Sequence, residues 1–499
     1  MIIPEDITNT LRDRGICVII PTFNNETTVV DVVKKVRDIC QDVIVVNDGS
    51  TDSTTKLLKE CNDITLVSYE KNRGKGYALK TGFRKALEMG FAYAITIDAD
   101  GQHNPNDIPK FLEANKLHPG CIIVGKRNLE NVERSKGSNF ANKFSNFWFA
   151  VQTGRCIKDT QTGYRLYPIK KLKGLSLLTN RYEAELQLMV FASWHGVKIF
   201  ETSVDVYYPP KEQRVSHFRP GMDFFRISLL NTLLCGLALV YGLPLAIIRW
   251  IIRFLRNAYT LITFVFFSIF IVTPAAWIYL KIGKITDKKK WNMHLLITWL
   301  AKFFMIRHGI PGTKFSYKVN EGVDFDRPHV IICNHQSHFD LMCQLIFSPK
   351  MVFLTKTWVY NNPFYGFVIR HADYIPVRDG LEKIMPKIKE LVDKGFSIAI
   401  YPEGTRSENC DIARFHQGAF YIADKLGIGI LPMCLYGTGK VLPKNKFSLH
   451  KGPIYIEVDK PISNEQLKQM GEYRQQASCL RKYYIKKYES IANRIEQDV

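Results

Sequence analysis

The sequence predicts two α/β domains separated by an apolar helical segment, and three observations support this. The chain has 499 residues, which at about 150 residues per domain corresponds to roughly three units. Short apolar strands alternate with helical stretches in both halves, and two uncharged apolar runs interrupt the middle. Hydrophobic residues make up 46% of the chain and charged residues 23%, a composition that excludes a disordered protein.

The first half, residues 15–225 after a short extension 1–14, contains five β-branched runs that end in polar residues. They read CVIIP, DVIVVND, ITLVSY, YAITIDAD and CIIVG. Between them, Thr27–Cys40 and Lys75–Met89 have helical apolar spacing. This alternation predicts a largely parallel sheet, in which ligands gather at the carboxyl ends of the strands.

The middle of the chain, residues 226–306, is predicted to be membrane-associated. The runs Ser228–Ile248 and Ala258–Leu280 would each form a helix of roughly 30 Å, enough to cross a bilayer core. The alternative is a pair of buried core helices. The connector Arg249–Asn257 carries three arginines, and basic residues flank both runs. We therefore expect a hairpin that either spans the membrane or lies in its plane, with both halves of the chain on one face.

The second half again mixes strands with helices over residues 307–465. The strand candidates are HVIICNH, FSIAIYPEG, IGILPMCLY and PIYIEV. The last residues, 466–499, are charged and helical in pattern, and the favoured interpretation is a solvated surface helix. No internal repeat is present, so the two halves are expected to be different folds.

The net charge of +21 requires an anionic partner of some kind. The basic residues cluster around the apolar runs and no nucleic-acid-binding motif is present, which favours anionic lipid over nucleic acid. The eleven cysteines include no CxxC pair, and the charged N-terminus lacks the apolar core of an export signal. Both features predict that the catalytic parts lie in the cytoplasm.

Paired carboxylates close one strand of the first half. Asp98 and Asp100 follow YAITI at positions i and i+2, where both side chains point the same way and suit a hard divalent cation. Asp48 ends another strand, and the glycine-rich loop Asn72–Gly76 precedes a helix, an arrangement typical of phosphate binding.

These motifs, IPTFNNE, VVNDGSTD, NRGKGYALKTGF, DADGQH and DTQTGYR, resemble the family 2 glycosyltransferases, in particular the dolichol- and polyprenyl-phosphate sugar transferases. The resemblance covers residues 15–225 and implies a GT-A fold, a nucleotide-sugar donor, Mg²⁺ or Mn²⁺, and inversion at the anomeric carbon. It implies that Pro21, Glu26 and Asp48 contact the nucleoside, and that Asp98, Asp100 and Gln102 hold the metal and diphosphate. It also implies that Lys75 faces phosphate and that Arg214 and Ser216 lie on a loop closing over it.

The catalytic base of this half is open. A phosphate acceptor is already an anion and needs no base, whereas a hydroxyl acceptor must lose its proton to a carboxylate. Asp159 is the favoured candidate and Glu183 or Glu185 the others. Asp159 could instead orient its loop, and the two glutamates could be helix-surface charges.

The second half carries NHQSHFD directly after the strand HVIIC. The spacing of five between His335 and Asp340 allows a turn that brings the carboxylate onto the imidazole, which makes a general base. A metal site formed by Cys333, His335, His338 and Asp340 is the less favoured alternative, because ligands from one short turn rarely complete a closed shell.

About 66 residues later the motif YPEGTRS follows FSIAI, and its arginine can bind a phosphate through two hydrogen bonds. NHxxxxD and EGTR together resemble the glycerolipid acyltransferases that esterify lysophosphatidic acid, over residues 310–465. The resemblance implies direct transfer from an acyl thioester on CoA or acyl carrier protein, without a cofactor, through His335 and Asp340. It implies that the acceptor is bound by Glu403, Gly404, Thr405 and Arg406, with Arg378 as a further basic residue.

The sequence therefore predicts a bifunctional transferase on the cytoplasmic face of the inner membrane, adding a sugar and an acyl chain to lipid acceptors. It also resembles fused glycosyltransferase–acyltransferase chains of bacterial glycolipid and aryl-polyene or flexirubin-type pigment pathways. The alternative is a monofunctional enzyme whose other half anchors or recruits.

Overall fold

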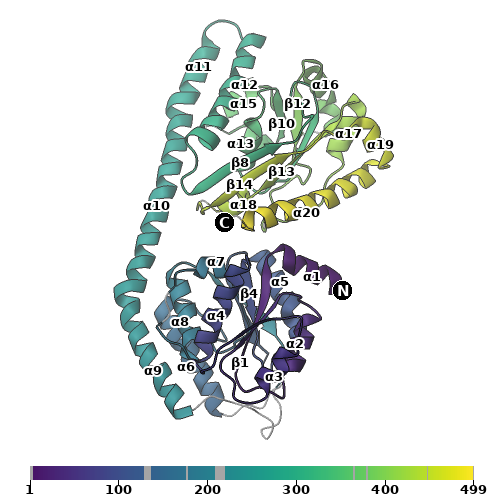
Figure 1. The fold of residues 1–499 in the computed structure, drawn as a ribbon. Helices are drawn as coiled ribbons and strands as arrows, with labels where there is room; N and C mark the ends of the chain where they lie inside the picture. Colours follow the sequence, from purple (N-terminus) through teal and green to yellow (C-terminus); the bar gives the residue numbers. More distant parts are fainter. Residues whose placement is uncertain are drawn as a thin grey trace. The chain divides into compact units, whose positions relative to one another are not determined.

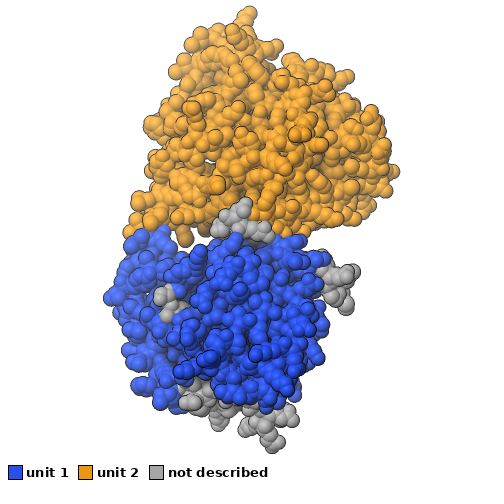
Figure 2. Space-filling view, viewed as in Figure 1, with its two compact units in different colours: residues 1–250, 496–499 blue, residues 251–495 orange. Residues whose placement is uncertain are grey.

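The computed structural model describes residues 4–128, 136–175, 178–207, 220–362, 366–377, 380–446 and 448–497. The chain divides into two compact units, Met1–Trp250 with Glu496–Val499, and Ile251–Ile495 (Figure 2). Each unit is built on a seven-stranded mixed sheet, so the prediction of two α/β domains is confirmed (Figure 1).

The sheet of the first unit has the order β3-β2-β1-β4-β6-β5-β7. Its strands are β1 Ile16–Thr22, β2 Val43–Asn47, β3 Thr65–Ser68, β4 Tyr93–Thr96, β5 Ile122–Arg127, β6 Arg165–Tyr167 and β7 Ile199–Val204. All five strands expected from the sequence are present. The three-residue strand β6 pairs antiparallel with both neighbours, and the other pairs are parallel.

Helices cover both faces of this sheet. One face packs against α1 Pro4–Asp13, α2 Val29–Arg37, α3 Thr54–Lys59 and α5 Ile108–Leu117, which follows the short helix η1 Pro105–Asp107. The other packs against α4 Lys75–Glu88, α6 Lys136–Thr153, α7 Ile169–Leu172, α8 Glu183–Trp194 and the start of α9 Pro220–Leu237. In β1, Val18 and Ile20 face the first layer while Cys17 and Ile19 face the second, because successive strand side chains alternate.

The sheet of the second unit has the order β11-β10-β12-β9-β13-β14-β8. Its strands are β8 Thr313–Val319, β9 Val330–Cys333, β10 Met351–Thr355, β11 Ile375–Pro376, β12 Ser397–Ile400, β13 Ile430–Tyr436 and β14 Gly452–Val458. Only the β13–β14 pair is antiparallel. The helices are α12 Asp287–Lys302 with η5 Phe303–Arg307, α13 Phe339–Leu345, α14 Thr357–Tyr360, α15 Gly366–His371, α16 Leu381–Asp393, α17 Gly418–Leu426, α18 Thr438–Val441, α19 Asn464–Gln469 and α20 Tyr473–Gln497.

The C-terminal helix α20 is present as predicted, but the expectation that it is merely solvated is wrong. Its residues Ala477, Leu480 and Tyr484 belong to the core of the second unit. The buried Tyr484 hydroxyl donates to the Ile332 carbonyl (2.8 Å) and accepts from the Met433 amide (3.1 Å). The charged residues that dominate the composition occupy the other faces of this amphipathic helix.

The apolar middle of the chain is a continuous helix and not a hairpin about Arg249–Asn257. It runs through α9, the π-helical turn η3 Ala238–Gly242, α10 Leu243–Phe266, the π-helical turn η4 Phe267–Val272 and α11 Thr273–Lys281. The connector RWIIRFLRN contains no glycine or proline, so nothing breaks the helix there. Pro244 and Pro274 each follow a π-helical turn, which accommodates the missing hydrogen bond.

A helical hairpin is nevertheless present further along, in the second unit, between α11 and α12 (Figure 1). Its turn contains Gly283 with φ +71°, and the Thr286 side chain caps α12 by accepting from the Lys289 amide. The rings of Phe267 and Phe303 lie 5.3 Å apart across the pair. The predicted hairpin of the two apolar runs is therefore wrong, because the chain is helical through Arg249–Asn257 and the turn of the observed hairpin lies after the second run.

By length and composition, one helix in the described part of the chain could cross a membrane. It covers Phe224–Phe264, 41 residues, and almost none of its apolar stretch is buried within the protein. The alternative of a buried core helix is therefore wrong for the first apolar run, whereas in the second run Ala276 and Leu280 belong to the core of the second unit.

Candidate active sites

The predicted carboxylate pair of the first unit lies just beyond β4, whose last residue is Thr96. Lys75, the first residue of α4, reaches this point: its Nζ lies 2.7 Å from Asp98 Oδ1 and 3.1 Å from Glu185 Oε2. Burial opposes the charge of Lys75, but Asp98 and Glu185 outweigh it and raise the Lys75 pKa. Residues 75, 98 and 185 thus form one partly buried ionic cluster from three separate parts of the chain.

Among the described residues, no salt bridge of this kind is formed by Asp100. Burial, and next the charge of Asp98, raise the pKa of Asp100 to about 6. Burial also opposes ionisation of Asp98, but Lys75 lowers its pKa overall. Nearby, burial lowers the pKa of His103 to about 4, and its buried Nδ1 has no hydrogen-bond partner in the part of the chain that the structure describes.

This arrangement fits a divalent cation. Two adjacent carboxylates, of which Asp100 lacks a neutralising charge, are the oxygen ligands that Mg²⁺ and Mn²⁺ prefer. Among the described residues no three His, Cys, Asp or Glu side chains form a ligand cluster, so the remaining ligands would come from Gln102, substrate or water. The Gln102 amide donates to Asp100 Oδ1 (3.0 Å), which places this residue beside the pair.

The predicted nucleoside contacts lie on two linked loops. Pro21 belongs to the buried strand β1. The Glu26 carboxylate accepts from the Ser53 amide (3.0 Å), which ties the loop after β1 to the loop after β2. The buried Asp48 accepts from the amides of Arg73 and Gly74, both at 2.8 Å. Asp48 therefore fixes the glycine-rich loop that leads into α4.

Asp159 is buried, and both of its carboxylate oxygens accept hydrogen bonds. Its Oδ2 accepts from Arg127 Nε (2.6 Å), and its Oδ1 accepts from Arg127 Nη2 (2.8 Å) and Asn142 Nδ2 (3.1 Å). Burial opposes ionisation, but the hydrogen bonds and charge of Arg127 lower the Asp159 pKa. These contacts favour the alternative in which Asp159 orients its loop.

The alternative that Glu183 and Glu185 are helix-surface charges is wrong. Both are buried in the first turn of α8, where the helix dipole favours carboxylates, and each has one oxygen without a hydrogen-bond partner among the described residues. Only Glu185 touches the Lys75 cluster. Arg214 and Ser216 lie outside the described residues.

The predicted dyad of the second unit is formed. His335 follows β9, and its Nδ1 lies 2.8 Å from Oδ2 of the fully buried Asp340 in α13. The same oxygen accepts from the amides of Gln336 (2.6 Å) and Ser337 (2.8 Å). Because Nδ1 faces the carboxylate, Nε2 is the nitrogen available to a substrate.

Two residues that the sequence interpretation missed complete this centre. The Thr438 hydroxyl, 98 positions beyond Asp340, donates to Asp340 Oδ1 (2.6 Å). The Tyr401 ring stacks on His335 with centroids 3.9 Å apart, and its hydroxyl accepts from Gln344 Nε2 (2.8 Å). Nothing in the sequence spacing connects Thr438 with the motif, whereas Tyr401 begins the predicted YPEGTRS segment.

The EGTR loop packs against the dyad. The buried Glu403 accepts from the His335 amide (2.9 Å) and the Ala413 amide (3.1 Å), so it supports the loop. Gly404 has φ +67°, a conformation that favours glycine. Thr405 is exposed, and half-buried Arg406 has no acidic partner among the described residues. Arg378 falls outside the described residues.

The metal alternative at this motif gains no support. Cys333 is fully buried, His338 is exposed, and the side chains of the described residues show no ligand group there. Burial, with the nearby charge of Arg406, lowers the His338 pKa.

Comparison with known proteins agrees with both halves. The family model for glycosyl transferase family 2 matches residues 17–167, and the model for acyltransferases matches residues 314–436. The chain is 31% identical over 221 residues to a UDP-N-acetylglucosamine–dolichyl-phosphate N-acetylglucosaminyltransferase of Methanococcus voltae, covering 40% of this chain and 88% of that protein.

The second half is 33% identical over 156 residues to the chloroplastic 1-acyl-sn-glycerol-3-phosphate acyltransferase LPAT1 of Arabidopsis thaliana, covering 29% of this chain. The chain spans 44% of the length of that relative. The crystal structure of the 1-acyl-sn-glycerophosphate acyltransferase PlsC from Thermotoga maritima matches with a TM-score of 0.41 and 21% identity, covering 50% of this chain and 97% of that one. The chain thus belongs to glycosyl transferase family 2 through its first half and carries an acyltransferase domain in its second.

Proposed function

We propose that this protein is a bifunctional, membrane-associated transferase that adds a sugar and an acyl chain to lipid acceptors. The observation that carries the proposal is that both halves keep a connected set of reactive side chains. Lys75, Asp98 and Glu185 cluster in the first, and His335 is paired with Asp340 in the second.

In the glycosyl step, a nucleotide sugar is the donor and a lipid phosphate or hydroxyl the acceptor. Asp98, Asp100 and Gln102 would hold Mg²⁺ or Mn²⁺, which when bound neutralises the leaving diphosphate. Lys75 stands beside the same carboxylates and supplies a fixed positive charge. The acceptor oxygen attacks the anomeric carbon with inversion while the nucleoside diphosphate leaves.

The base of this step depends on the acceptor. Because Asp159 already accepts three side-chain hydrogen bonds, its contacts support an orienting role through Arg127. A lipid phosphate acceptor requires no base, and the relative from M. voltae is named for transfer to dolichyl phosphate. For a hydroxyl acceptor, Glu185 is the carboxylate nearest the ionic cluster.

In the acyl step, His335 Nε2 removes the proton of the acceptor hydroxyl, and the oxygen attacks the thioester carbonyl of acyl-CoA or acyl carrier protein. Asp340 holds the imidazole by its Nδ1 and stabilises the imidazolium that forms. The carbon–sulfur bond then breaks, and the leaving thiolate takes the proton from the imidazolium of His335. Arg406, with Gly404, Thr405 and Arg378, would bind an acceptor phosphate.

Membrane association is supported by the apolar helix Phe224–Phe264 and by the lipid-acting relatives. Two arginines within this helix donate to backbone carbonyls, Arg249 to Trp194 in the first unit and Arg256 to Leu449 in the second. These contacts favour a helix lying in the interface with its arginines in the aqueous layer. We place both catalytic units on the cytoplasmic face of the inner membrane, in a bacterial glycolipid or lipid-linked pigment pathway.

The test is lipid mass spectrometry of a strain lacking this protein, complemented with wild type, Asp100→Ala or His335→Ala. We expect Asp100→Ala to lose the sugar mass and His335→Ala to lose the acyl mass. If either variant restores the complete wild-type lipid profile, the protein is monofunctional and the corresponding half anchors or recruits.

A further inference from the structure

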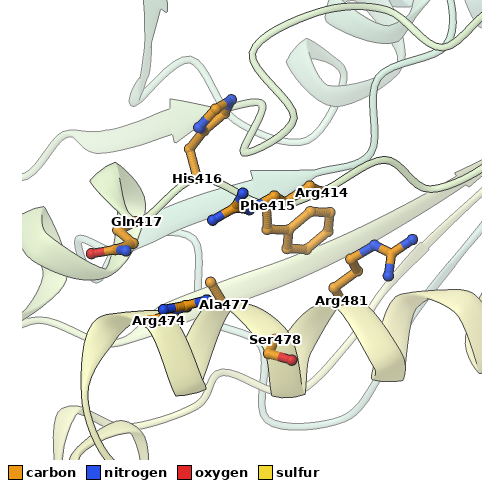
Figure 3. Close-up of a pocket in the computed structure, with 8 residues that line it drawn as sticks. All are labelled: Arg414, Phe415, His416, Gln417, Arg474, Ala477, Ser478 and Arg481. Atoms are coloured by element: carbon orange, nitrogen blue, oxygen red, sulfur yellow. The ribbon is translucent and has the colours of Figure 1, made fainter.

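A cavity of about 420 Å³ lies in the second unit, outside the dyad and the EGTR loop. One wall is the segment Arg414–Gln417, and the other is the first two turns of α20 (Figure 3). Arg474, Ala477, Ser478 and Arg481 line it from α20, at the i, i+3, i+4 and i+7 spacing that places them on one helix face.

The lining of this cavity is strongly cationic. Three arginines, Arg414, Arg474 and Arg481, contribute to it together with His416, and the eight described lining residues include no carboxylate. Arg414 and Arg474 are exposed and have no acidic partner among the described residues. Buried Phe415 and Ala477 add an apolar floor. Such a lining suits a phosphate ester attached to an uncharged organic group.

The cavity is built into the catalytic region. Arg481 donates from Nε to the Ala413 carbonyl (3.0 Å) and from Nη2 to the Ile412 carbonyl (3.1 Å), which fixes α20 to the loop. Glu403 bonds both the Ala413 amide and the His335 amide. The His416 amide donates to the Pro402 carbonyl (2.8 Å), so the wall of the cavity and the EGTR loop are one hydrogen-bonded unit.

The acyl acceptor and the acyl donor place their phosphates differently. A lysophosphatidate-type acceptor carries its phosphate close to the reacting hydroxyl, where Arg406 stands. An acyl donor carries its phosphate at the far end of the pantetheine arm, so the donor phosphate must be bound near, but outside, the catalytic centre. The arginine cavity lies outside the catalytic centre and is linked to it through the hydrogen bonds of Glu403.

We propose that the cavity between Arg414–Gln417 and α20 binds the phosphate end of the phosphopantetheine arm of the acyl donor. The inference rests on the proposed acyl transfer and identifies where the acyl donor binds. The same arm occurs in CoA and in acyl carrier protein, and the experiment separates the two sources.

The experiment measures binding of CoA, 4′-phosphopantetheine and pantetheine to the full-length protein by calorimetry. The variants are Arg414→Ala, Arg474→Ala and the double variant, with Lys482→Ala as the control. Lys482 is exposed on the same helix and does not line the cavity. Each cavity variant should weaken CoA and phosphopantetheine binding by about tenfold, as expected for one lost charged hydrogen-bonding group, and Lys482→Ala should leave it unchanged. Pantetheine, which lacks the phosphate, should bind weakly to every form.

Kinetics provide a second readout. The cavity variants should raise KM for the acyl donor and leave kcat and the KM of the acceptor near wild type. Parallel assays with acyl-CoA and with acyl carrier protein identify the donor, since the KM effect appears only with the carrier that is used. A rise in the acceptor KM instead would assign the cavity to an acceptor phosphate and overturn the proposal.

His335→Ala separates this inference from the proposed function. We expect it to bind CoA like wild type while losing acyl transfer. Retained acyl transfer in His335→Ala would overturn the proposed function. Wild-type CoA affinity in a folded Arg414→Ala/Arg474→Ala protein, or no phosphopantetheine binding by wild type, would overturn the cavity assignment alone.

Discussion

The two candidate centres differ in how complete they are without a ligand. At the acyl centre, Asp340 receives hydrogen bonds from His335, Thr438 and two backbone amides, so its buried charge is compensated by the protein itself. At the glycosyl centre, Asp98 and Glu185 both contact Lys75, and burial and the charge of Asp98 raise the pKa of Asp100 to about 6. In the proposed mechanism, the substrate complex would supply the counter-charge that a pair of neighbouring carboxylates requires.

Under the proposed function, this difference corresponds to two strategies of catalysis in one chain. The acyl centre would place a proton acceptor by hydrogen bonds that are present before substrate arrives. The glycosyl centre would use its paired carboxylates to bind a metal-bound diphosphate. The two halves should therefore respond to different perturbations, and the following experiments exploit this.

The largest expected effect is at the acyl centre. His335→Ala removes the only base of the proposed mechanism and should lower kcat for acyl transfer by about a thousandfold. Sugar transfer should stay within twofold of wild type. Radiolabelled acyl and sugar incorporation, measured in parallel, checks this. The exposed neighbour His338→Ala is the control and should retain most of the activity.

The second effect is at the glycosyl centre. Chelation by EDTA, or Asp98→Asn, should reduce sugar transfer by about a hundredfold or more, because the leaving diphosphate loses its counter-charge. Acyl transfer should be unaffected by EDTA, and Mn²⁺ should restore sugar transfer. Asp63→Asn, on the surface, is the matched control. Equal sensitivity of both reactions to EDTA would contradict the contrast between the centres.

A smaller effect concerns the missed residue Thr438. Thr438→Val removes a hydrogen bond to buried Asp340 and should cost about 1–2 kcal/mol, seen as roughly a tenfold fall in kcat for acyl transfer. Thr438→Ser keeps the hydroxyl and should restore the rate. If the Thr438→Val enzyme is as fast as wild type, the backbone amides of Gln336 and Ser337 are sufficient to hold Asp340 in place.

The smallest effect is on stability in acid. Although burial opposes its ionisation, Lys487 and Arg494 lower the pKa of Glu457 from 4.5 to about 2. A lowered carboxyl pKa stabilises the fold above pH about 4.5, and this stabilisation is lost as the pH falls toward 2. Solvent screening reduces it to about 1–2 kcal/mol.

Denaturant unfolding at pH 6 and pH 3 checks this assignment. Glu457→Gln should lose stability at pH 6 and less than half as much at pH 3, with Glu489→Gln, exposed on α20, as the control. The change in the free energy of unfolding should appear in the unfolding transition of the second unit. A loss of equal size at both pH values would mean that Glu457 acts through packing.

The sequence by itself determined the fold class and the two families, and it supplied most of the candidate site residues. Strand periodicity predicted β1 to β5 and the central strands of the second unit. Local motifs predicted the His335–Asp340 contact, because five residues of chain confine the pair. The sequence interpretation did not identify β6, β7, β8, β10 and β11. The short strands β6 and β11 and the mostly exposed edge strand β8 contain no apolar run, whereas β10 contains one that was overlooked.

Tertiary structure alone decided the rest, because these contacts join residues that are distant in the chain. Lys75 meets Glu185 across 110 positions, Thr438 meets Asp340 across 98, and α20 closes a cavity over Arg414. Local spacing carries no information about such pairs. Packing also decided that the charged tail helix joins the core and that the Arg249–Asn257 connector continues a helix. Amino-acid composition sets the helix propensity of a segment, but its burial depends on the neighbours that it packs against.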